Sequence, residues 1–190
     1  MAIGGDMLRF ATFLYLAGVL VFPAFAETYL IKPNGTGDYP TIQEAIDAAV
    51  DGDSILLADG VFTGPGNRDL QIAGKAITVA SQSGNADDCV VDCEGTEAEN
   101  HRFTYFQDGE TETTVLDGFT IRNGWQEVAG GGIRCDSSPL IIRCVFENCR
   151  AALGAGLGIG GDPRIEDCVF RNNVASFQGG GLDMGDYASP

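Results

Sequence analysis

The stretch PLIIRCVFEN at residues 139–148 decides the fold, because its pattern returns one period later as PRIEDCVFRN at residues 163–172. A looser copy lies one period before the first stretch, and its matching residues are Phe119, Ile121 and Asn123. Glycine-rich runs share the period: GGGI at 130–133, GAGL at 154–157 and GGGL at 179–182. Self-similarity at a period of about 24 residues indicates a solenoid or another array of repeats.

The composition of the repeat selects one kind of solenoid. No amphipathic stretch of the length that helical repeats need occurs in this region, and the leucine frame of leucine-rich repeats is absent. A coil of about 24 residues with three short strands and Gly, Asn and Pro at its corners is typical of a parallel β-helix. The predicted fold class is therefore all-β, a parallel β-helix preceded by one capping helix.

Stacked coils place equivalent residues about 4.8 Å apart, so a repeat predicts columns of like side chains. Cys144 over Cys168 and Phe146 over Phe170 are expected to point inward as apolar columns. An asparagine ladder with paired amides is expected at one bend, and its members are Asn123, Asn148 and Asn172. The glycines are expected at sharp turns or close approaches between coils, where a Cβ would clash.

Three segments organise the chain. Residues 1–26 read as a signal peptide, with Arg9 before an apolar stretch at 10–22 and the cleavage pattern Ala24-Phe25-Ala26. The apolar stretch is too short to span a bilayer. The signal predicts a secreted protein, extracellular, on the outer surface or periplasmic, with no transmembrane segment after cleavage. An uncleaved anchor is the alternative.

Residues 27–53 are interpreted as an N-terminal strand and the capping helix, and residues 54–190 as coils that are cut short at the C-terminus. The helix begins after Thr41, and Glu44 completes a capping box. Its apolar face is expected to contain Ile42, Ala45, Ile46, Ala49 and Val50. Early strands are expected at 55–57, 61–63, 70–72, 77–80 and 90–92.

The composition excludes several classes of function. The chain has 27 Gly in 190 residues, too few for collagen, and 44% hydrophobic residues, too many for disorder. Its net charge of −16 repels phosphate, so nucleic acid is not an expected partner. The run GLGIGG at 156–161 matches a nucleotide-binding pattern, but Asp162-Pro163 follows it in place of a helix, so no nucleotide is expected.

Six cysteines make up an even number, which in an exported chain suggests disulfides in any of 15 pairings. The repeat instead favours inward, unpaired thiols for Cys144 and Cys168. An acidic stretch supplies three carboxylates suited to Ca²⁺, those of Asp87, Asp88 and Asp92. No ligand spacing accompanies them, so a solvated acidic face is the favoured interpretation, and no cofactor is predicted beyond this weak calcium candidate.

Three residues are candidates for binding a substrate. Trp125, the only Trp, lies in a loop before the Gly130 run and is suited to stacking on a sugar ring. Arg134 and Asp136 flank the same glycine-rich strand and could join that site. The alternative for Trp125 is packing on the coil edge. His101, the only His, is expected to be a surface residue without a catalytic role.

Two further motifs carry a family resemblance. GDYPTIQEAI at 37–46 and LDGFTIRNG at 116–124 resemble pectin lyase-like right-handed parallel β-helix proteins of the exported bacterial type. The resemblance implies a right-handed coil and a polysaccharide as partner. The catalytic marks of the enzymes in this superfamily are not found. The chain is therefore interpreted as an exported scaffold that is surface-associated or binds polysaccharide, and the alternatives are a polysaccharide lyase or carbohydrate esterase and an adhesin or autotransporter-like passenger.

Overall fold

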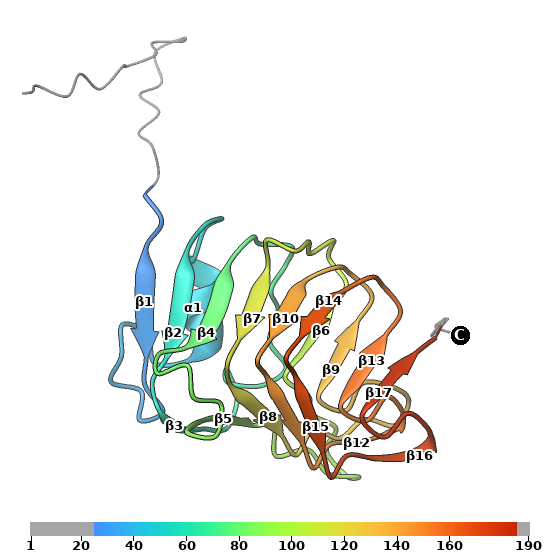
Figure 1. The fold of residues 1–190 in the computed structure, drawn as a ribbon. Helices are drawn as coiled ribbons and strands as arrows, with labels where there is room; N and C mark the ends of the chain where they lie inside the picture. The colour runs from blue at the N-terminus through green and yellow to red at the C-terminus, as the bar shows by residue number, and fades with distance from the viewer. Residues whose placement is uncertain (1–24, 186–190) are drawn as a thin grey trace, which may run out of the picture.

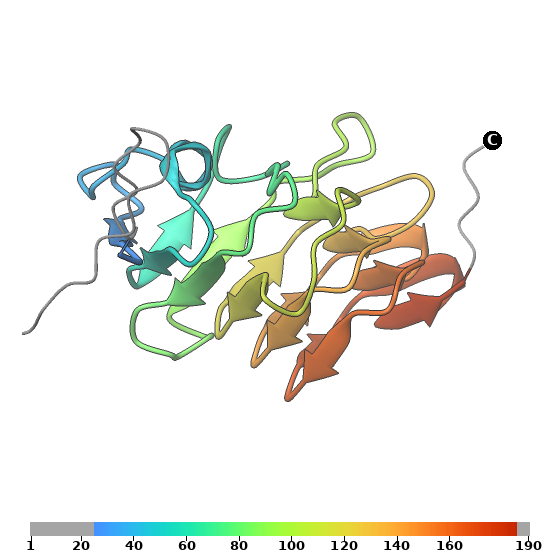
Figure 2. The same cartoon turned by 90° about the horizontal axis from the view of Figure 1, so that it is seen from above.

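The computed structural model describes residues 25–185, so most of the predicted signal peptide and residues 186–190 lie outside the described part. The chain forms a parallel β-solenoid of about 6 turns with one short helix near the N-terminus (Figure 1). Figure 2 shows the coils stacked along one axis, from the helix end to the C-terminal end. The predicted fold class is confirmed.

Four parallel sheets form the walls of the solenoid, and each is named here by its order along a coil. The first wall contains β1 (Thr28–Ile31), β2 (Ser54–Leu57), β4 (Thr78–Ser81), β7 (Val115–Asp117), β10 (Leu140–Ile142) and β14 (Arg164–Glu166). The second wall contains β3 (Gly60–Phe62), β5 (Cys89–Asp92), β8 (Thr120–Arg122), β11 (Val145–Glu147) and β15 (Val169–Arg171). The third wall contains β12 (Arg150–Leu153) and β16 (Val174–Gln178). The fourth wall contains β6 (Thr104–Phe106), β9 (Ile133–Cys135), β13 (Leu157–Ile159) and β17 (Leu182–Met184).

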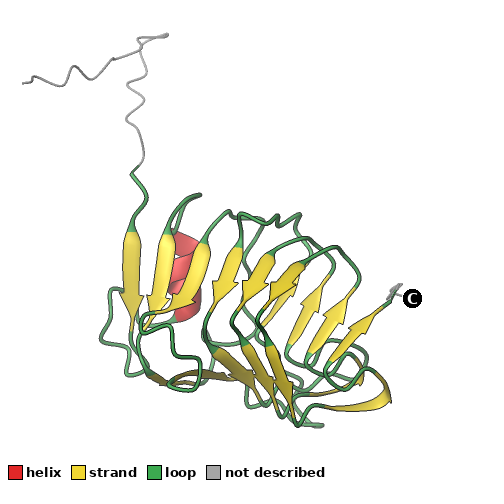
Figure 3. Cartoon of the chain, in the orientation of Figure 1, coloured by secondary structure: helices red, strands yellow, loops and turns green. Residues whose placement is uncertain are grey.

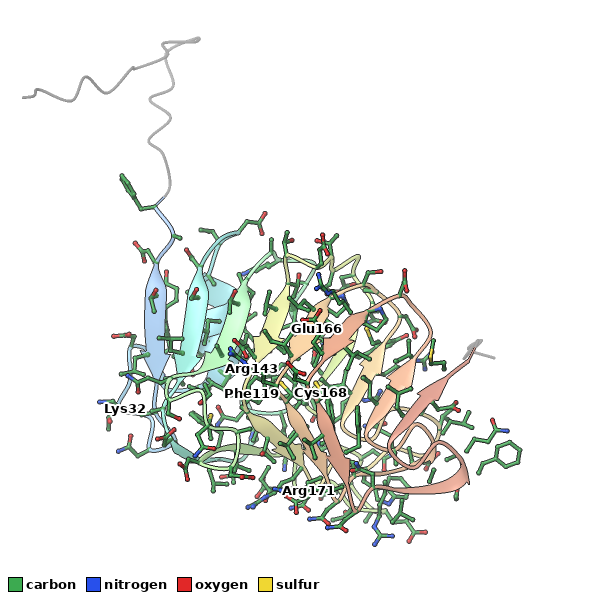
Figure 4. The ribbon with its side chains drawn as sticks, in the orientation of Figure 1. Lys32, Phe119, Arg143, Glu166, Cys168 and Arg171 are labelled. Atoms are coloured by element: carbon green, nitrogen blue, oxygen red, sulfur yellow. The ribbon has the colours of Figure 1, made fainter. Side chains whose placement is uncertain are left out.

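The register between coils is the one that the repeat predicts. Phe146 pairs with Phe170 on one side and with Ile121 on the other. The rings of the two phenylalanines stack, with centroids 4.9 Å apart and planes 8° from parallel. Cys144 is fully buried in the core. Cys168, labelled in Figure 4, is half-buried against the same core. All six cysteines are free thiols, so the even count does not reflect disulfides in this fold.

The glycines serve both of the expected purposes. Gly130, Gly154 and Gly179 begin the three runs and have φ of 66°, 51° and 62°, a left-handed conformation that glycine adopts without strain. Later in each run the coils approach closely: a Cβ on Gly132 would lie 2.6 Å from the carbonyl oxygen of Gly156. The glycine content is thus a requirement of turning and stacking.

The asparagine column is confirmed as a bend but not as a ladder of amides. The residues at the bend adopt the left-handed conformation, with φ of 55°, 54° and 58° at Asn123, Asn148 and Asn172. The side-chain amide of Asn123 donates to Asp92 instead of to the next asparagine. What the three positions share is therefore a backbone conformation that asparagine tolerates well.

The N-terminal end of the solenoid is covered by α1 (Ile42–Ala48), the red helix beside the first strands in Figure 3. Thr41 is its N-cap, and its hydroxyl accepts a hydrogen bond from the Glu44 backbone N–H. The helix buries Ile42, Ala45 and Ile46. Val50 is 53% exposed, so its assignment to the apolar face is wrong: the helix ends at Ala48, and Ala49 is already extended.

The strand expected at 70–72 is also absent. Leu70 forms a single bridge to Thr104, and the segment lies between Asp69 and Ala73, whose φ values of 53° and 57° interrupt an extended backbone. Leu70 and Ile72 are nevertheless buried, which explains why the segment reads as a strand. Among residues 25–185 there is no helix with the length and apolar character that crossing a membrane requires.

Candidate functional site

Trp125 is held in the third wall by its backbone. It forms a parallel bridge to Arg150 on the next coil and an antiparallel bridge to His101. The backbone N–H of Trp125 donates a hydrogen bond to the His101 carbonyl oxygen, with an N···O distance of 2.8 Å. Gly95 packs closely against the same hydrogen bond, since a Cβ there would lie 2.5 Å from the Trp125 nitrogen and 2.9 Å from the His101 carbonyl oxygen. The half-buried Trp125 therefore has a fixed backbone position, although it lies in a loop.

Two open hollows meet at this residue, and together they are called the Trp125 groove. The first, about 400 Å³, is lined by Glu97, Trp125, Gln126, Glu127, Arg150, Ala151, Ala152, Val174 and Ser176. The second, about 430 Å³, is lined by Asp92, Glu94, Gly95, Thr96, Asn123, Gly124, Trp125, Asn148 and Arg150. Trp125 and Arg150 line both. Because Arg150 follows Trp125 in the column and Val174 follows Arg150, the groove crosses successive coils.

The charges of the groove divide into paired and unpaired groups. Asp92 lies 2.9 Å from Arg122, and Glu94 lies 2.6 Å from Arg68. The exposed side chains of Glu97, Glu127 and Arg150 form no ion pair with another group in the part of the chain that the structure describes. Two carboxylates and one guanidinium beside the indole are thus available to a ligand.

Arg134 and Asp136 belong to a different site. They form an ion pair of 3.1 Å on the fourth wall, at β9. Arg134 covers the ring of Tyr105 at 4.8 Å from the centroid, and the Tyr105 hydroxyl donates to Asp136. Neither Arg134 nor Asp136 lines the Trp125 groove. The expectation that they join Trp125 in one site is therefore not supported by their placement, because the coil carries the two sets on different walls.

The companions of Arg134 come from the preceding coil. Burial and the hydrogen bond to Asp136 raise the pKa of Tyr105. Arg102 lies 5.7 Å from the centre of the same ring, and burial together with the nearby Arg134 lowers its pKa to about 10. This cluster is internally paired at Tyr105, Arg134 and Asp136, which is the arrangement of a structural contact between coils.

The calcium candidates are not brought together. Asp87 lies 3.0 Å from Arg171, Asp88 accepts a 2.6 Å hydrogen bond from Asn85, and Asp92 faces Arg122. Residues 25–185 contain no group of three or more His, Cys, Asp or Glu arranged to hold a metal ion. Each carboxylate is directed at its own cation or amide, so these residues do not form a calcium site with one another.

The two remaining motifs have structural surroundings. His101, expected at the surface, is half-buried, and its Nδ1 lies 2.6 Å from an Asp69 carboxylate oxygen. The run at 156–161 contains β13 and is followed by β14, so the helix that a nucleotide-binding turn needs does not follow it. Both observations leave the Trp125 groove as the candidate site.

Sequence reasoning found the indole but missed the residues around it. Arg150 lies one repeat period after Trp125, so the period itself was a signal that the two are neighbours. Glu97 of the groove precedes the recognisable repeats, as does Tyr105 of the Arg134 cluster, and no comparable spacing marks either residue. No family model, curated protein or solved structure matches the chain.

Proposed function

We propose that this protein is an exported β-solenoid scaffold that binds polysaccharide along the Trp125 groove. The observation that carries the proposal is the position of the only indole in the chain, half-buried and shared by two open hollows. An indole offers a large flat apolar surface together with a polar N–H, which suits a sugar ring with its apolar face and hydroxyl rim.

The direction of the groove supports a polymer over a small ligand. Trp125, Arg150 and Val174 occupy one column on successive coils, so the lining continues along the solenoid axis. A chain of sugars laid on this column would meet a new set of side chains at each coil, about 4.8 Å further on. The hollows are open to solvent, so the polymer need not enter by an end.

The resemblance to pectin lyase-like proteins supports the same class of ligand and a location outside the cell or at its surface. It does not extend to an activity, because the catalytic marks of those enzymes are absent from the sequence. The proposal is accordingly one of binding and display by a rigid scaffold.

The test is a glycan array probed with the chain from residue 27 onward. The affinity of the unchanged chain and of the Trp125→Ala variant for a glycan that binds is then measured by titration. Loss of the ring is expected to weaken binding by about tenfold, equivalent to about 1.4 kcal/mol. Phe177→Ala is the matched control, since Phe177 is a 77% exposed aromatic on the same wall and lines neither hollow. Binding to no glycan, or equal binding by Trp125→Ala and the unchanged chain, would overturn the proposal.

A further inference from the structure

We infer that the Trp125 groove selects a polysaccharide bearing protonated amino groups, such as a polymer of unacetylated hexosamine, over one bearing uronate carboxylates. This inference rests on the proposed function and names its ligand class. It starts from the three unpaired charges of the lining, which are two carboxylates and one guanidinium, and from the indole that lines the same hollow.

The two carboxylates approach the indole from separate loops. Glu97 lies in the loop after β5 on the preceding coil, and Glu127 lies two residues beyond Trp125. Both are exposed and line the first hollow with the indole. An ammonium group bound in this hollow would be attracted by the ring face and by the two carboxylates of the lining, and Trp is the most effective ring for a cation–π interaction.

Arg150 sets a limit on where the positive charge of the ligand can lie. It occupies the following coil and is the only cation among the described residues that line either hollow. An ammonium group is therefore expected on the side of Glu97 and Glu127, while the guanidinium of Arg150 donates to hydroxyl oxygens of the neighbouring sugar. The groove thereby places the ammonium group of one sugar and the hydroxyl groups of its neighbour beside different residues of the lining.

The field of the whole molecule acts in the same direction. The chain carries 27 Asp and Glu against 11 Lys and Arg, a net charge of −16. Such a field raises the local concentration of cationic ligands and repels polyanions, and salt weakens both effects. A uronate polymer would meet this repulsion and the two unpaired carboxylates beside the indole.

The test uses the single Trp as its own reporter. Fluorescence of the chain from residue 27 onward is titrated with oligosaccharides of equal length made of glucosamine, N-acetylglucosamine or galacturonate. At low salt the glucosamine oligomer is expected to bind about tenfold more tightly than its neutral N-acetylated counterpart, the galacturonate oligomer is expected to bind most weakly, and added salt is expected to shrink the difference.

Two double variants separate a local effect from that of net charge. Glu97→Gln with Glu127→Gln is expected to abolish the preference for glucosamine and to keep binding of the neutral oligomer. Glu112→Gln with Asp162→Asn removes the same charge from a different open hollow of about 520 Å³, which has no aromatic lining, and is expected to keep the preference.

The outcomes distinguish this inference from the proposed function. Neutral or galacturonate oligomers that bind as tightly as glucosamine overturn the inference and leave polysaccharide binding in place. Equal loss of preference in both double variants also overturns it, because net charge alone would then be responsible. Failure of every oligosaccharide to bind counts against the proposed function itself.

Discussion

The coil at residues 139–162 and its copy at residues 163–185 carry the same signature but differ in burial. Phe146 is fully buried, whereas Phe170 is only partly buried, although their rings stack on one another. The same contrast holds for Ile141 and Ile165, for Cys144 and Cys168, and for Leu157 and Leu182. Within the described residues the first coil lies between two others and the second contacts a coil on one side (Figure 1).

The repeat therefore determines whether a side chain points inward, and the presence of neighbouring coils determines how completely that side chain is buried. A coil of this kind has too little interior to exclude water by itself, so its apolar column gains stability from the coils above and below. Equivalent positions in the two coils are therefore matched controls for one another, with identical or similar chemistry and a different number of neighbours.

On the outer surface, neighbouring coils also determine which partner a charged side chain has. The column Asp92, Arg122, Glu147 and Arg171 alternates in sign along the second wall. Arg122 pairs with Asp92 at 2.9 Å, and Arg171, at the outer face of β15, pairs with Glu147 at 3.2 Å (Figure 4). The exposed pair of Arg171 and Glu147 contributes little stability by itself, but opposite charges on adjacent coils disfavour a slip of register.

The largest expected difference between the coils concerns the stacked rings. Phe146→Ala is expected to cost about 3–5 kcal/mol of unfolding free energy, and Phe170→Ala about 1–3 kcal/mol, because only the first ring is fully buried. Both variants remove the same ring stack, so the difference reports the second neighbour of Phe146, which is Ile121. Urea unfolding followed by circular dichroism measures it, and equal losses would contradict the role assigned to neighbouring coils.

This comparison also explains how far the sequence predicted the fold. The period was visible because residues 116–182 repeat their apolar, Gly and Asn positions, and those positions defined the walls and the register. The earlier coils conform to the same walls without a repeated signature. There a buried segment such as 70–72 read as a strand, since the left-handed residues beside it are Asp69 and Ala73 and not glycine.

The candidate site was predicted only in its central residue. Trp125 stood out as the single indole, whereas Arg134 and Asp136 were near it in sequence and lie on another wall. A coil turns its chain through several walls within one period, so proximity in sequence is a poor guide to a shared surface. The repeat period, which links Trp125 to Arg150, is the better guide.

A smaller difference is expected at the glycines that face the next coil. A Cβ on Gly156 would lie 2.5 Å from the carbonyl oxygen of Gly181, whereas a Cβ on Gly181 would meet the Phe170 side chain at 3.1 Å. Gly156→Ala must displace a backbone and is expected to cost about 1–3 kcal/mol, and Gly181→Ala less than about 1 kcal/mol. Neither glycine has a left-handed φ, so backbone strain does not contribute to the difference in unfolding free energy between the two variants.

Thermal and urea unfolding of the two alanine variants would test this. A loss at Gly181→Ala as large as that at Gly156→Ala would contradict the close approach between coils as the reason for the glycine. Gly64→Ala is a useful reference, since its Cβ would meet no atom within 4 Å and its φ of 77° isolates the cost of the left-handed backbone alone.

The smallest expected difference concerns the buried thiols and alkaline pH. Burial raises the pKa of Cys144 to about 12, and burial also raises the pKa of the half-buried Cys168. An unfolded thiol has a pKa of about 8.5, so the unfolded chain releases protons that the folded chain retains. The stabilising effect is fully present below the unfolded pKa and is lost as the pH rises from there toward the folded pKa.

Replacing one buried cysteine therefore reduces the loss of unfolding free energy at alkaline pH. Between about pH 8.5 and pH 9.5, Cys144→Ala is expected to lose about 1 kcal/mol less unfolding free energy than the unchanged chain. Cys168→Ala is expected to show a smaller relief, because its thiol is less completely removed from water. Urea unfolding at the two pH values measures both slopes. Equal relief in the two variants would contradict the smaller shift expected at Cys168, and would mean that its thiol keeps its proton through about pH 9.5 although the last described coil has a neighbour on one side only.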